Sequence, residues 1–325
     1  MKSESISGLN SNNSVNYDIK SDLIYKLDEY IKLKHYRLVN SVVVFKDNAL
    51  IFERYYNKFN ELSRNNIKSI WKSILSICIG ICLDKGYIKS LDAPIGDYLK
   101  IFSKNIHPYH RLIKIRDLLT MSSGIYWNGG IHYHCPMLQQ LFYSEDWLAH
   151  IADVAVTNVP GTKHVYKEWD VILLSAIINK VTGMGAFEFC NEFVYKPLGI
   201  ESSEWGRSSC GINYNIIGGQ EEKSDLTAKE LSKIGLLILN NGQWNSKQII
   251  SSNYISQAVT PSPQDKNYGF LWWLFEGGYA CRGYGGQEVN VLPEQKLVAV
   301  IQAKPTPQSK SYGDIFTNVI RKAFC

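Results

Sequence analysis

The chain lacks several features that would place it in whole classes of protein. No run of about 18 apolar residues occurs in its 325 residues, so no transmembrane helix is predicted. No dense block of lysine and arginine accompanies the net charge of +5, which argues against nucleic-acid binding. Gly-x-Ser-x-Gly is absent, and with it the nucleophile elbow of α/β-hydrolases. We find no internal repeat.

Paired cysteine spacing is missing as well. The seven cysteines are an odd number, and Cys78, Cys82 and Cys190 fall in apolar helical patterns that are typical of buried thiols. The polar segment 1–17 has no apolar core of a secretory signal, and we interpret it as a disordered lead-in. These observations predict a protein of the reducing cytoplasm.

The segment His132-Tyr133-His134-Cys135 has metal-ligand side chains close together. No further ligand pair with recognisable spacing follows, so we expect neither a metal nor a cofactor and favour a loop that lines a substrate site. Tyr126-Trp127 and Trp272-Trp273 are the aromatic pairs that could line a cleft. Core packing is the alternative for Trp272 or Trp273, because a strand alternates its faces.

What is present is a globular composition, with 45% hydrophobic residues, on a chain long enough for one large domain or two lobes. Strands are expected at 41–45, 50–56, 268–275, 278–281, 287–292 and 298–303, and the main helices at 21–34, 67–85, 170–182, 227–240 and 313–324. This order predicts an α+β fold with one antiparallel sheet from both chain ends, flanked by helices, and an inserted helical lobe. We assign the sheet lobe to 18–70 plus 207–325 and the mainly helical lobe to 71–206, with the active site between the lobes.

A serine and a lysine three residues apart open the first long helical pattern, in Ser69-Ile70-Trp71-Lys72. Residues at this spacing share one helix face. A serine hydroxyl becomes a nucleophile when a neighbouring base takes its proton, and a held, partly desolvated lysine can do so. The pattern predicts covalent acyl transfer without a histidine, the alternative being an ordinary serine and lysine at a helix start.

Two further segments could supply a second base and an oxyanion site. Tyr166 follows the turn Pro160-Gly161-Thr162, and a lysine ammonium nearby would favour its phenolate. Residues 283–287, Gly-Tyr-Gly-Gly-Gln, precede a strand, and their backbone N–H groups could stabilise a tetrahedral intermediate. The plainer alternatives are a packed tyrosine and a tight β-turn.

Taken in order, these motifs resemble the serine β-lactamase and penicillin-binding protein superfamily. Residues 69–72 stand as its S-x-x-K motif, 115–124 are similar to a loop common in these proteins, and 160–183 are similar to the segment with Y-x-N or Y-x-S. Residues 226–231 and 268–273 resemble further landmarks. The resemblance runs from about residue 40 over nearly the whole chain and implies a β-lactamase/transpeptidase-like fold.

The resemblance also implies roles for the site residues. Ser69 would be the acylated nucleophile, Lys72 its base partner, and Tyr166 the second base and the proton donor to the leaving group. The backbone N–H groups of Ser69 and Tyr284 would hold the oxyanion. Residues 283–287 are most similar to the 6-aminohexanoate-dimer hydrolase and carboxylesterase subgroup of the class C side. The residues expected to contact substrate are Tyr126, Trp127, Glu168, Arg282, Gly283 and Gln287.

Two positions depart from the family pattern. Glu168 stands where the family usually has Asn or Ser, and its carboxylate would favour a charged Lys72. The usual K-T-G or H-x-G triad reads Cys281-Arg282-Gly283, so a thiol replaces the cation. Bringing Lys72 from a pKa of about 10.4 to about 7 would need roughly 4–5 kcal/mol. The sequence leaves open whether Lys72 loses its proton or stays charged while Tyr166 acts as the base.

We therefore predict a serine hydrolase that cleaves an ester or amide bond of a small molecule or peptide through an acyl-enzyme on Ser69. One alternative is a β-lactamase or D,D-peptidase. An alternative of another class is a ligand-binding or sensing protein without turnover on a hydrolase scaffold, which Glu168 and Cys281 would mark. Partners other than the substrate are not expected, neither nucleic acid nor membrane, and the sequence indicates no oligomeric state.

Overall fold

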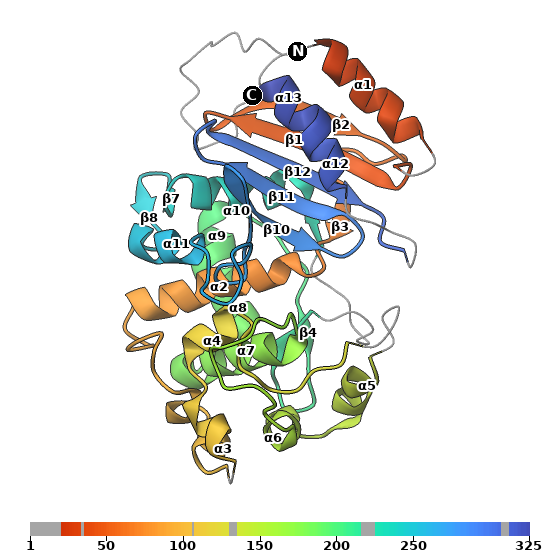
Figure 1. Cartoon of the computed structure of the whole chain (residues 1–325). Coiled ribbons are helices and arrows are strands. Elements are labelled where there is room, and N and C mark those ends of the chain that lie inside the picture. The colour runs from red at the N-terminus through yellow and green to blue at the C-terminus, as the bar shows by residue number, and fades with distance from the viewer. Residues whose placement is uncertain (1–20, 34–35, 106, 130–134, 216–224, 307–311) are drawn as a thin grey trace. The chain divides into compact units, whose positions relative to one another are not determined.

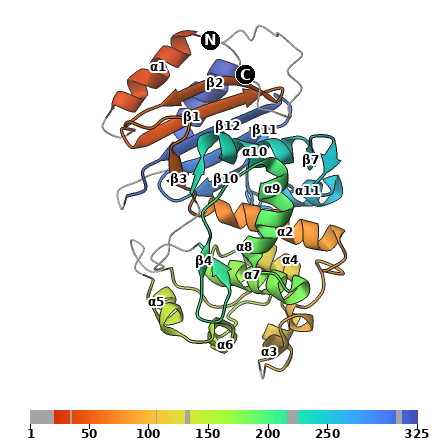
Figure 2. The same ribbon diagram turned by 180° about the vertical axis from the view of Figure 1, so that it is seen from behind.

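A computed structural model describes residues 21–33, 36–105, 107–129, 135–215, 225–306 and 312–325, with side chains from residue 25 on (Figures 1 and 2). The predicted lead-in 1–17 lies outside these residues. The strands are β1 Val39–Lys46, β2 Ala49–Tyr55, β3 Arg64–Asn66, β4 Gly206–Arg207, β5 Asn213–Tyr214, β6 Asp225–Thr227, β7 Gln243–Trp244, β8 Lys247–Gln248, β9 Trp273–Phe275, β10 Gly278–Gly283, β11 Gln287–Leu292 and β12 Leu297–Ala303.

Helices make up most of the remaining regular structure. The α-helices are α1 Ser21–Lys32, α2 Ile70–Asp84, α3 Lys100–Ser103, α4 Ile115–Leu119, α5 Pro136–Tyr143, α6 Trp147–Asp153, α7 Glu168–Thr182, α8 Ala186–Cys190, α9 Lys196–Leu198, α10 Ala228–Leu239, α11 Ser252–Ala258, α12 Gly313–Ile315 and α13 Arg321–Phe324. Short 3₁₀ turns occur at Ile95–Asp97 and Pro108–Leu112, and π-helical turns at Asn191–Tyr195 and Phe316–Ile320.

The main sheet has six strands in the order β2-β1-β12-β11-β10-β9. The N-terminal β1 pairs antiparallel with the C-terminal β12, so both chain ends contribute to one sheet. Asp47 and Asn48 have φ values of 48° and 64° and form the two-residue turn between β1 and β2, because both residue types tolerate the left-handed region that such hairpin turns require. The predicted α+β fold is confirmed.

Apolar side chains on the two faces of this sheet bind different helices. Val42, Ala299 and Ile301 lie in one buried cluster with α1 and the C-terminal helical run α12–α13, which cover the same face in Figure 1. On the opposite face, Gly235 of α10 comes so close to Val289 and Val298 that a Cβ atom would lie within 2.8 Å of a methyl group of each. Strand alternation supplies both faces, because every second residue points the same way.

The chain divides into two compact units, Met1–Ile70 with Asp225–Lys247 and Phe275–Cys325, and Trp71–Ser224 with Gln248–Leu274. The first contains β1, β2, β10, β11 and β12 of the main sheet, whereas Trp273 and Leu274 of β9 belong to the second. The prediction placed all of 207–325 with the sheet, but 207–215 and 248–274 belong to the second unit. The reason is that α11 is tied to α2 within that unit: Tyr254 and Ser76 are hydrogen-bonded at 3.0 Å, and the Ser251 N–H donates to the Asp84 carboxylate at 2.7 Å.

The second unit is organised around α2 and α7, which are apolar almost all round. Residues 169–178 of α7 are all buried. In the described ranges no helix alone has the length and apolar content for crossing a membrane. Helix α7 and the helical run Ala186–Leu198 meet that requirement only together, and a bend of 76° separates them.

All seven cysteines lie in the described residues and are reduced thiols. Cys78, Cys82 and Cys190 are buried, as the sequence predicts, and Cys135 and Cys281 are buried as well. Cys210 and Cys325 are exposed. Burial raises the pKa of the Cys82 thiol, which keeps it protonated and unreactive at neutral pH.

Two glycines of the second unit, Gly124 and Gly183, differ in how closely other atoms approach them. Gly124 has a φ of 76°, and a Cβ atom there would lie 2.0 Å from the Asn158 carbonyl oxygen. Gly183, after α7, has a φ of 72° with nothing within 4 Å of the same atom. We expect Gly183→Ala to cost about 1 kcal/mol of unfolding free energy, for the backbone conformation alone. Gly124→Ala should cost at least about 1 kcal/mol more, because backbone must also move.

Urea unfolding of both variants and the wild type measures these two costs. Equal losses in the two variants would show that the Asn158 carbonyl moves aside freely and that this loop is loosely packed.

Candidate active site

Ser69 lies directly before Ile70, the first residue of α2, and is partly buried. The residue before it, Lys68, has a φ of 50°, and its N–H donates to the Asn66 side chain at 2.9 Å. A non-glycine residue in the left-handed region costs roughly 1–3 kcal/mol and persists where the surroundings hold it. The backbone therefore turns sharply just before Ser69 and presents it at the start of the helix.

Gly283, the last residue of β10, lies against the segment that leads to Ser69. A Cβ atom at Gly283 would lie 2.3 Å from the Ile67 carbonyl oxygen, so only glycine fits. Residues 284–286 connect β10 to β11, and Gly285 and Gly286 have φ values of 82° and 87°. The two segments predicted to provide oxyanion N–H groups, Ser69 and Tyr284, thus approach each other within the first unit.

Lys72 and Glu168 form a buried ion pair. Lys72 Nζ lies 2.8 Å from Glu168 Oε1, and the side chains are 2% and 13% exposed. Glu168 is the first residue of α7, where the helix N-terminus favours a negative charge. Lys72 is in the first turn of α2, so the pair joins the starts of these two helices.

The charge state of Lys72 follows from this pairing. Burial lowers the pKa of Lys72, but the Glu168 carboxylate and the Tyr166 hydroxyl oppose it, so that the pKa is raised above its ordinary value. Lys72 is therefore an ammonium ion at neutral pH. Of the two charge states that the sequence leaves open for Lys72, the geometry favours the ammonium.

Tyr166 lies beside this ammonium. Lys72 Nζ is 5.3 Å from the centre of the Tyr166 ring. The ring of Trp273 stacks on Tyr166 with a centroid distance of 5.7 Å and an interplanar angle of 26°, and Tyr268 contacts it edge-on at 6.4 Å. Trp272, by contrast, is buried. The aromatic pair Trp272-Trp273 is thus divided between core packing and contact with Tyr166.

A second buried ion pair fixes the segment that carries Tyr166. Lys167 Nζ lies 3.2 Å from Asp170 Oδ2, and Ser123 Oγ donates to Asp170 Oδ1 at 2.5 Å. Lys167 and Asp170 are 1% and 0% exposed. Burial raises the pKa of Asp170, and Lys167 and Ser123 oppose that rise. The sequence analysis did not identify this network, although the i, i+3 spacing of Lys167 and Asp170 is a signal for it.

Two predicted substrate contacts are not supported by the geometry. Gln287 is fully buried, and its amide accepts a hydrogen bond from Asn65 at 2.9 Å and donates to the Ala303 carbonyl at 2.5 Å. Arg282 pairs in register with Glu288, so it shares the sheet face of Ile301, whereas Gly283 lies on the other face. Gln287 is a structural amide, and Arg282 points away from the Gly283 side of β10.

Tyr126 and Trp127, two further predicted contacts, lie near the start of α7. The Tyr126 carbonyl oxygen accepts a hydrogen bond from Trp169 Nε1 at 3.1 Å, and the Trp127 ring meets Trp169 edge-on at 5.0 Å. Tyr126 is 45% exposed. His132 and His134 lie outside the described residues, and among the described ones no group of three or more His, Cys, Asp or Glu side chains could hold a metal ion.

Comparison with known proteins adds the following. The family model described as Beta-lactamase matches residues 32–319. An uncharacterized protein of Alkalihalophilus pseudofirmus is 24% identical over 80% of this chain and 82% of its own length. A "Putative D-alanyl-D-alanine carboxypeptidase" of Escherichia coli O157:H7 is 22% identical over 49% of this chain, and the match spans 48% of that protein.

Solved structures show the same fold. A "putative beta-lactamase" from Bacteroides dorei superimposes with a TM-score of 0.76 and 16% identity, covering 95% of this chain and 99% of its own. A "Putative 6-aminohexanoate-dimer hydrolase" from Bacillus anthracis gives a TM-score of 0.72 with 21% identity over 91% of this chain and 80% of its own.

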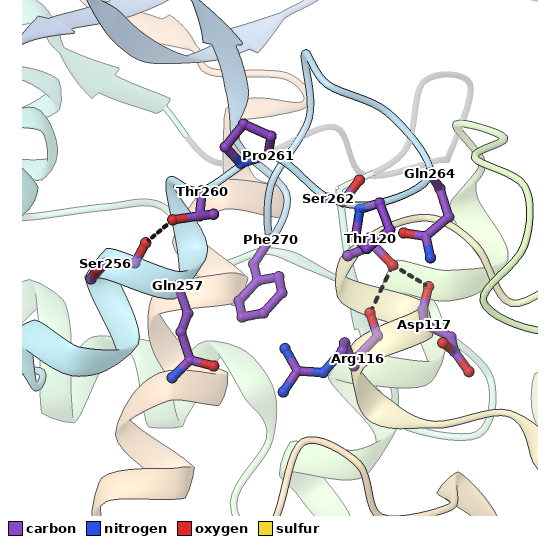
Figure 3. A pocket seen from close by; sticks show the side chains of 11 residues that line it. Arg116, Asp117, Thr120, Ser256, Gln257, Thr260, Pro261, Ser262, Gln264 and Phe270 are labelled. Atoms are coloured by element: carbon purple, nitrogen blue, oxygen red, sulfur yellow. Dashed lines mark hydrogen bonds between the residues drawn. The ribbon is translucent and has the colours of Figure 1, made fainter.

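A cavity of about 230 Å³ lies elsewhere in the second unit and includes none of the predicted site residues in its walls. Figure 3 shows the Arg116 guanidinium and the Gln257 side chain beside the Phe270 ring in its wall. The Arg116 guanidinium carbon is 5.4 Å from the centre of the Phe270 ring, and Asp92 forms an ion pair with Arg116 at 3.2 Å. Asp117 is part of the same wall, and burial raises its pKa to about 6.

Asp117 yields a prediction on pH dependence. Its pKa is 3.8 in an unfolded chain and about 6 in the fold, so the folded state binds the proton more tightly between these values. Stability contributed by this group therefore falls as pH rises from about 4 to about 6, and stays low above that. The difference between these two pKa values corresponds to at most roughly 3 kcal/mol of unfolding free energy. Asp117→Asn should remove this fall and raise the unfolding free energy at pH 7 by about 1–3 kcal/mol.

Urea unfolding of wild type and Asp117→Asn at pH 4, 5, 6 and 7 tests this. The asparagine keeps an acceptor for the Lys114 N–H, which donates to Asp117 at 2.9 Å. Parallel pH curves for the two proteins would show that Asp117 ionises in the fold as it does in the unfolded chain.

Proposed function

The chain belongs to the Beta-lactamase family, a family of serine hydrolases, and we propose that it cleaves an ester or amide bond of a small molecule or peptide through an acyl-enzyme on Ser69. The observation that carries this proposal is the buried ion pair of Lys72 and Glu168, which lies beside Tyr166. Lys72 follows Ser69 by three residues. Such a pair costs free energy to bury and places a fixed ammonium next to a phenol.

In the proposed acylation step, Ser69 Oγ attacks the carbonyl carbon and its proton passes to the phenolate oxygen of Tyr166. The Lys72 ammonium lies beside the Tyr166 ring, 5.3 Å from its centre. The carbonyl oxygen becomes an oxyanion that accepts hydrogen bonds from the N–H groups of Ser69 and Tyr284. The tetrahedral intermediate collapses when Tyr166 gives the proton to the leaving alcohol or amine, so that Tyr166 is a phenolate again.

Deacylation repeats the same proton movements. A water molecule attacks the acyl carbon and its proton passes to the Tyr166 phenolate. Collapse of the second intermediate returns that proton to Ser69 Oγ and releases the acid. Each step conserves charge, and Lys72 stays protonated throughout, as its pairing with Glu168 favours.

We propose ester or amide substrates ahead of β-lactams for two reasons. One structural neighbour is named as a 6-aminohexanoate-dimer hydrolase. Cys281, a buried thiol, stands where the lactamase pattern has a cation for the substrate carboxylate. D,D-peptidase or β-lactamase activity is the second candidate, supported by the partial similarity to the E. coli carboxypeptidase.

We further propose that the protein works in a reducing compartment such as the cytoplasm, on a small molecule or peptide, without nucleic acid or membrane as a partner. The reduced state of the seven cysteines supports this placement.

Substitution of the nucleophile tests the function. Ser69→Ala should lower p-nitrophenyl ester hydrolysis by at least about 10³-fold, because no oxygen remains to form the acyl-enzyme. Far-UV circular dichroism and the urea midpoint should stay at wild-type values. In the wild type, a fluorophosphonate should add one phosphonyl group, which peptide mapping locates on Ser69.

The same mass measurement separates the candidate functions. A penicillin adduct that clears within seconds, with turnover of a chromogenic cephalosporin, would favour the second candidate. A Ser69 adduct that never clears, with no turnover on a panel of esters and amides, would leave a ligand-binding or sensing role. Unchanged ester hydrolysis in Ser69→Ala would rule out the mechanism.

Replacing Glu168 tests the electrostatics. Glu168→Gln removes the carboxylate that opposes the effect of burial, so the pKa of Lys72 should fall. The proposed mechanism needs Lys72 as an ammonium ion, so the falling alkaline limb of the kcat/KM profile should move to lower pH. Glu53→Gln, at a partly exposed ion pair in the first unit, is the control.

Measurement of kcat/KM between pH 5 and 10 gives the position of that limb for both variants. A limb that moves to higher pH, or that coincides with the wild-type limb, would contradict the assigned role of Glu168.

A further inference from the structure

Leu271 is in a backbone conformation that its residue type rarely adopts. Its φ is 62°, and its side chain is 1% exposed. For a bulky residue the left-handed region is a genuine outlier, worth roughly 1–3 kcal/mol of strain. Such strain persists only where neighbouring groups hold the backbone, and it concentrates at functional sites.

Three hydrogen bonds hold Leu271. Its N–H donates to the carbonyl oxygens of Leu119 at 2.9 Å and Gly269 at 3.0 Å. Its own carbonyl oxygen accepts a hydrogen bond from Ser73 Oγ of α2 at 2.6 Å. Leu271 and Phe270 form the tip of a tight turn that is closed by the Gly269 N–H and the Trp272 carbonyl at 2.9 Å. Phe270 points from this turn into the cavity of Figure 3.

This turn leads directly to the residue that stacks on Tyr166. Tyr268 and Trp273 form an antiparallel bridge across the base of the turn. The Tyr268 ring meets Trp273 edge-on at 4.9 Å, and Trp273 stacks on Tyr166. The conformation of Leu271 thus sets the direction in which Trp273 leaves the turn, and with it the position of the stacked ring.

The hydroxyl that holds Leu271 comes from the residue next to Lys72. Ser73 is 2% exposed, and consecutive helix residues point about 100° apart. One turn of α2 therefore binds Glu168 through Lys72 and the Leu271 turn through Ser73. Both contacts converge on Tyr166, one through the ammonium beside its ring and the other through Trp273.

We propose that Ser73 is a positioning residue, which fixes the Tyr166 ring against Lys72 through Leu271 and Trp273. It touches no reacting atom. The structural part of this inference stands on contacts within the second unit, and its catalytic consequence rests on the proposed function. Loss of the Ser73 hydroxyl lets the strained turn relax, so that the rings of Trp273 and Tyr166 are both displaced from their native positions.

The experiment that tests this proposal measures the environment of the Tyr166 ring directly. Tyr166 is replaced by 3-fluorotyrosine, and its ¹⁹F signal is compared in the wild type, Ser73→Ala and Ser76→Ala. Ser76 is the matched control, because it is a fully buried serine of the same helix whose hydroxyl bonds to Tyr254 and not to the Leu271 turn. Both changes remove one buried hydroxyl and leave a helix-favouring residue.

We expect Ser73→Ala to shift or broaden the ¹⁹F signal and Ser76→Ala to leave it at the wild-type position. In ester hydrolysis, Ser73→Ala should lower kcat by about 10-fold or more with little change in KM, because displaced catalytic groups cost rate and not binding. Trp273→Phe, which keeps an aromatic stack, should lie closer to the wild type in both readouts than Trp273→Ala.

Different results would contradict the positioning role of Ser73 and the proposed function. Equal ¹⁹F spectra for Ser73→Ala and Ser76→Ala would overturn the positioning role whatever the activity. A shift confined to Ser73→Ala in a protein whose Ser69 neither labels nor hydrolyses esters would support the positioning role and refute the proposed function.

Discussion

The ion pair between Lys72 and Glu168 is the interaction on which the rest of the site depends. Two opposite charges are almost fully removed from water, which is costly for either one alone. Removing one partner of such a pair typically costs about 3–5 kcal/mol, because the other charge is left buried. The pair therefore holds the starts of α2 and α7 together and keeps Lys72 protonated. Any chemistry at Ser69 has to be compatible with an ammonium at this position.

A second ion pair, between Lys167 and Asp170, makes the surroundings of Tyr166 rigid. Lys167 directly precedes α7, and Glu168 and Asp170 lie in its first turn. Lys167 binds Asp170, which also accepts from Ser123, and Glu168 binds Lys72. Negative charges at a helix N-terminus are favourable, so the turn tolerates two carboxylates. With Trp273 on its ring, Tyr166 is fixed from both its backbone and its side chain. In the proposed mechanism, a tyrosine held in this way requires little reorganisation during proton transfer.

Much of the fold is predictable from the sequence, because it depends on local patterns. Alternation of apolar residues locates β11 and β12, and Asp47-Asn48 identifies a hairpin turn from residue type alone. The position of Ser69 at the start of α2 follows from the change from a polar to an apolar run. The segment 268–275 is the exception: its apolar run predicts a strand, but only Trp273–Phe275 is one. Phe270 binds Ala258, and Leu271 binds Leu119 and Ser73, all of them distant in sequence.

Side-chain direction is the other part that the sequence does not fix. Arg282 and Gly283 are neighbours in one motif, and their opposite faces follow from the register of β10 with β11. Gln287 follows two glycines, a position from which a side chain could contact a ligand. Its amide is instead hydrogen-bonded to Asn65 and Ala303. Glu168 could be recognised as a departure from the family pattern. Its effect on Lys72 required knowing that both side chains are buried and 2.8 Å apart.

The distribution of thiols has a practical consequence. Five cysteines are inside the protein and two, Cys210 and Cys325, are at its surface. An alkylating reagent added to the folded molecule meets two sulfur atoms, and the remaining five become available only as the chain opens. Counting modified sulfurs by mass thus gives a built-in gauge of unfolding that needs no attached dye, and the two surface thiols offer ready points for immobilisation.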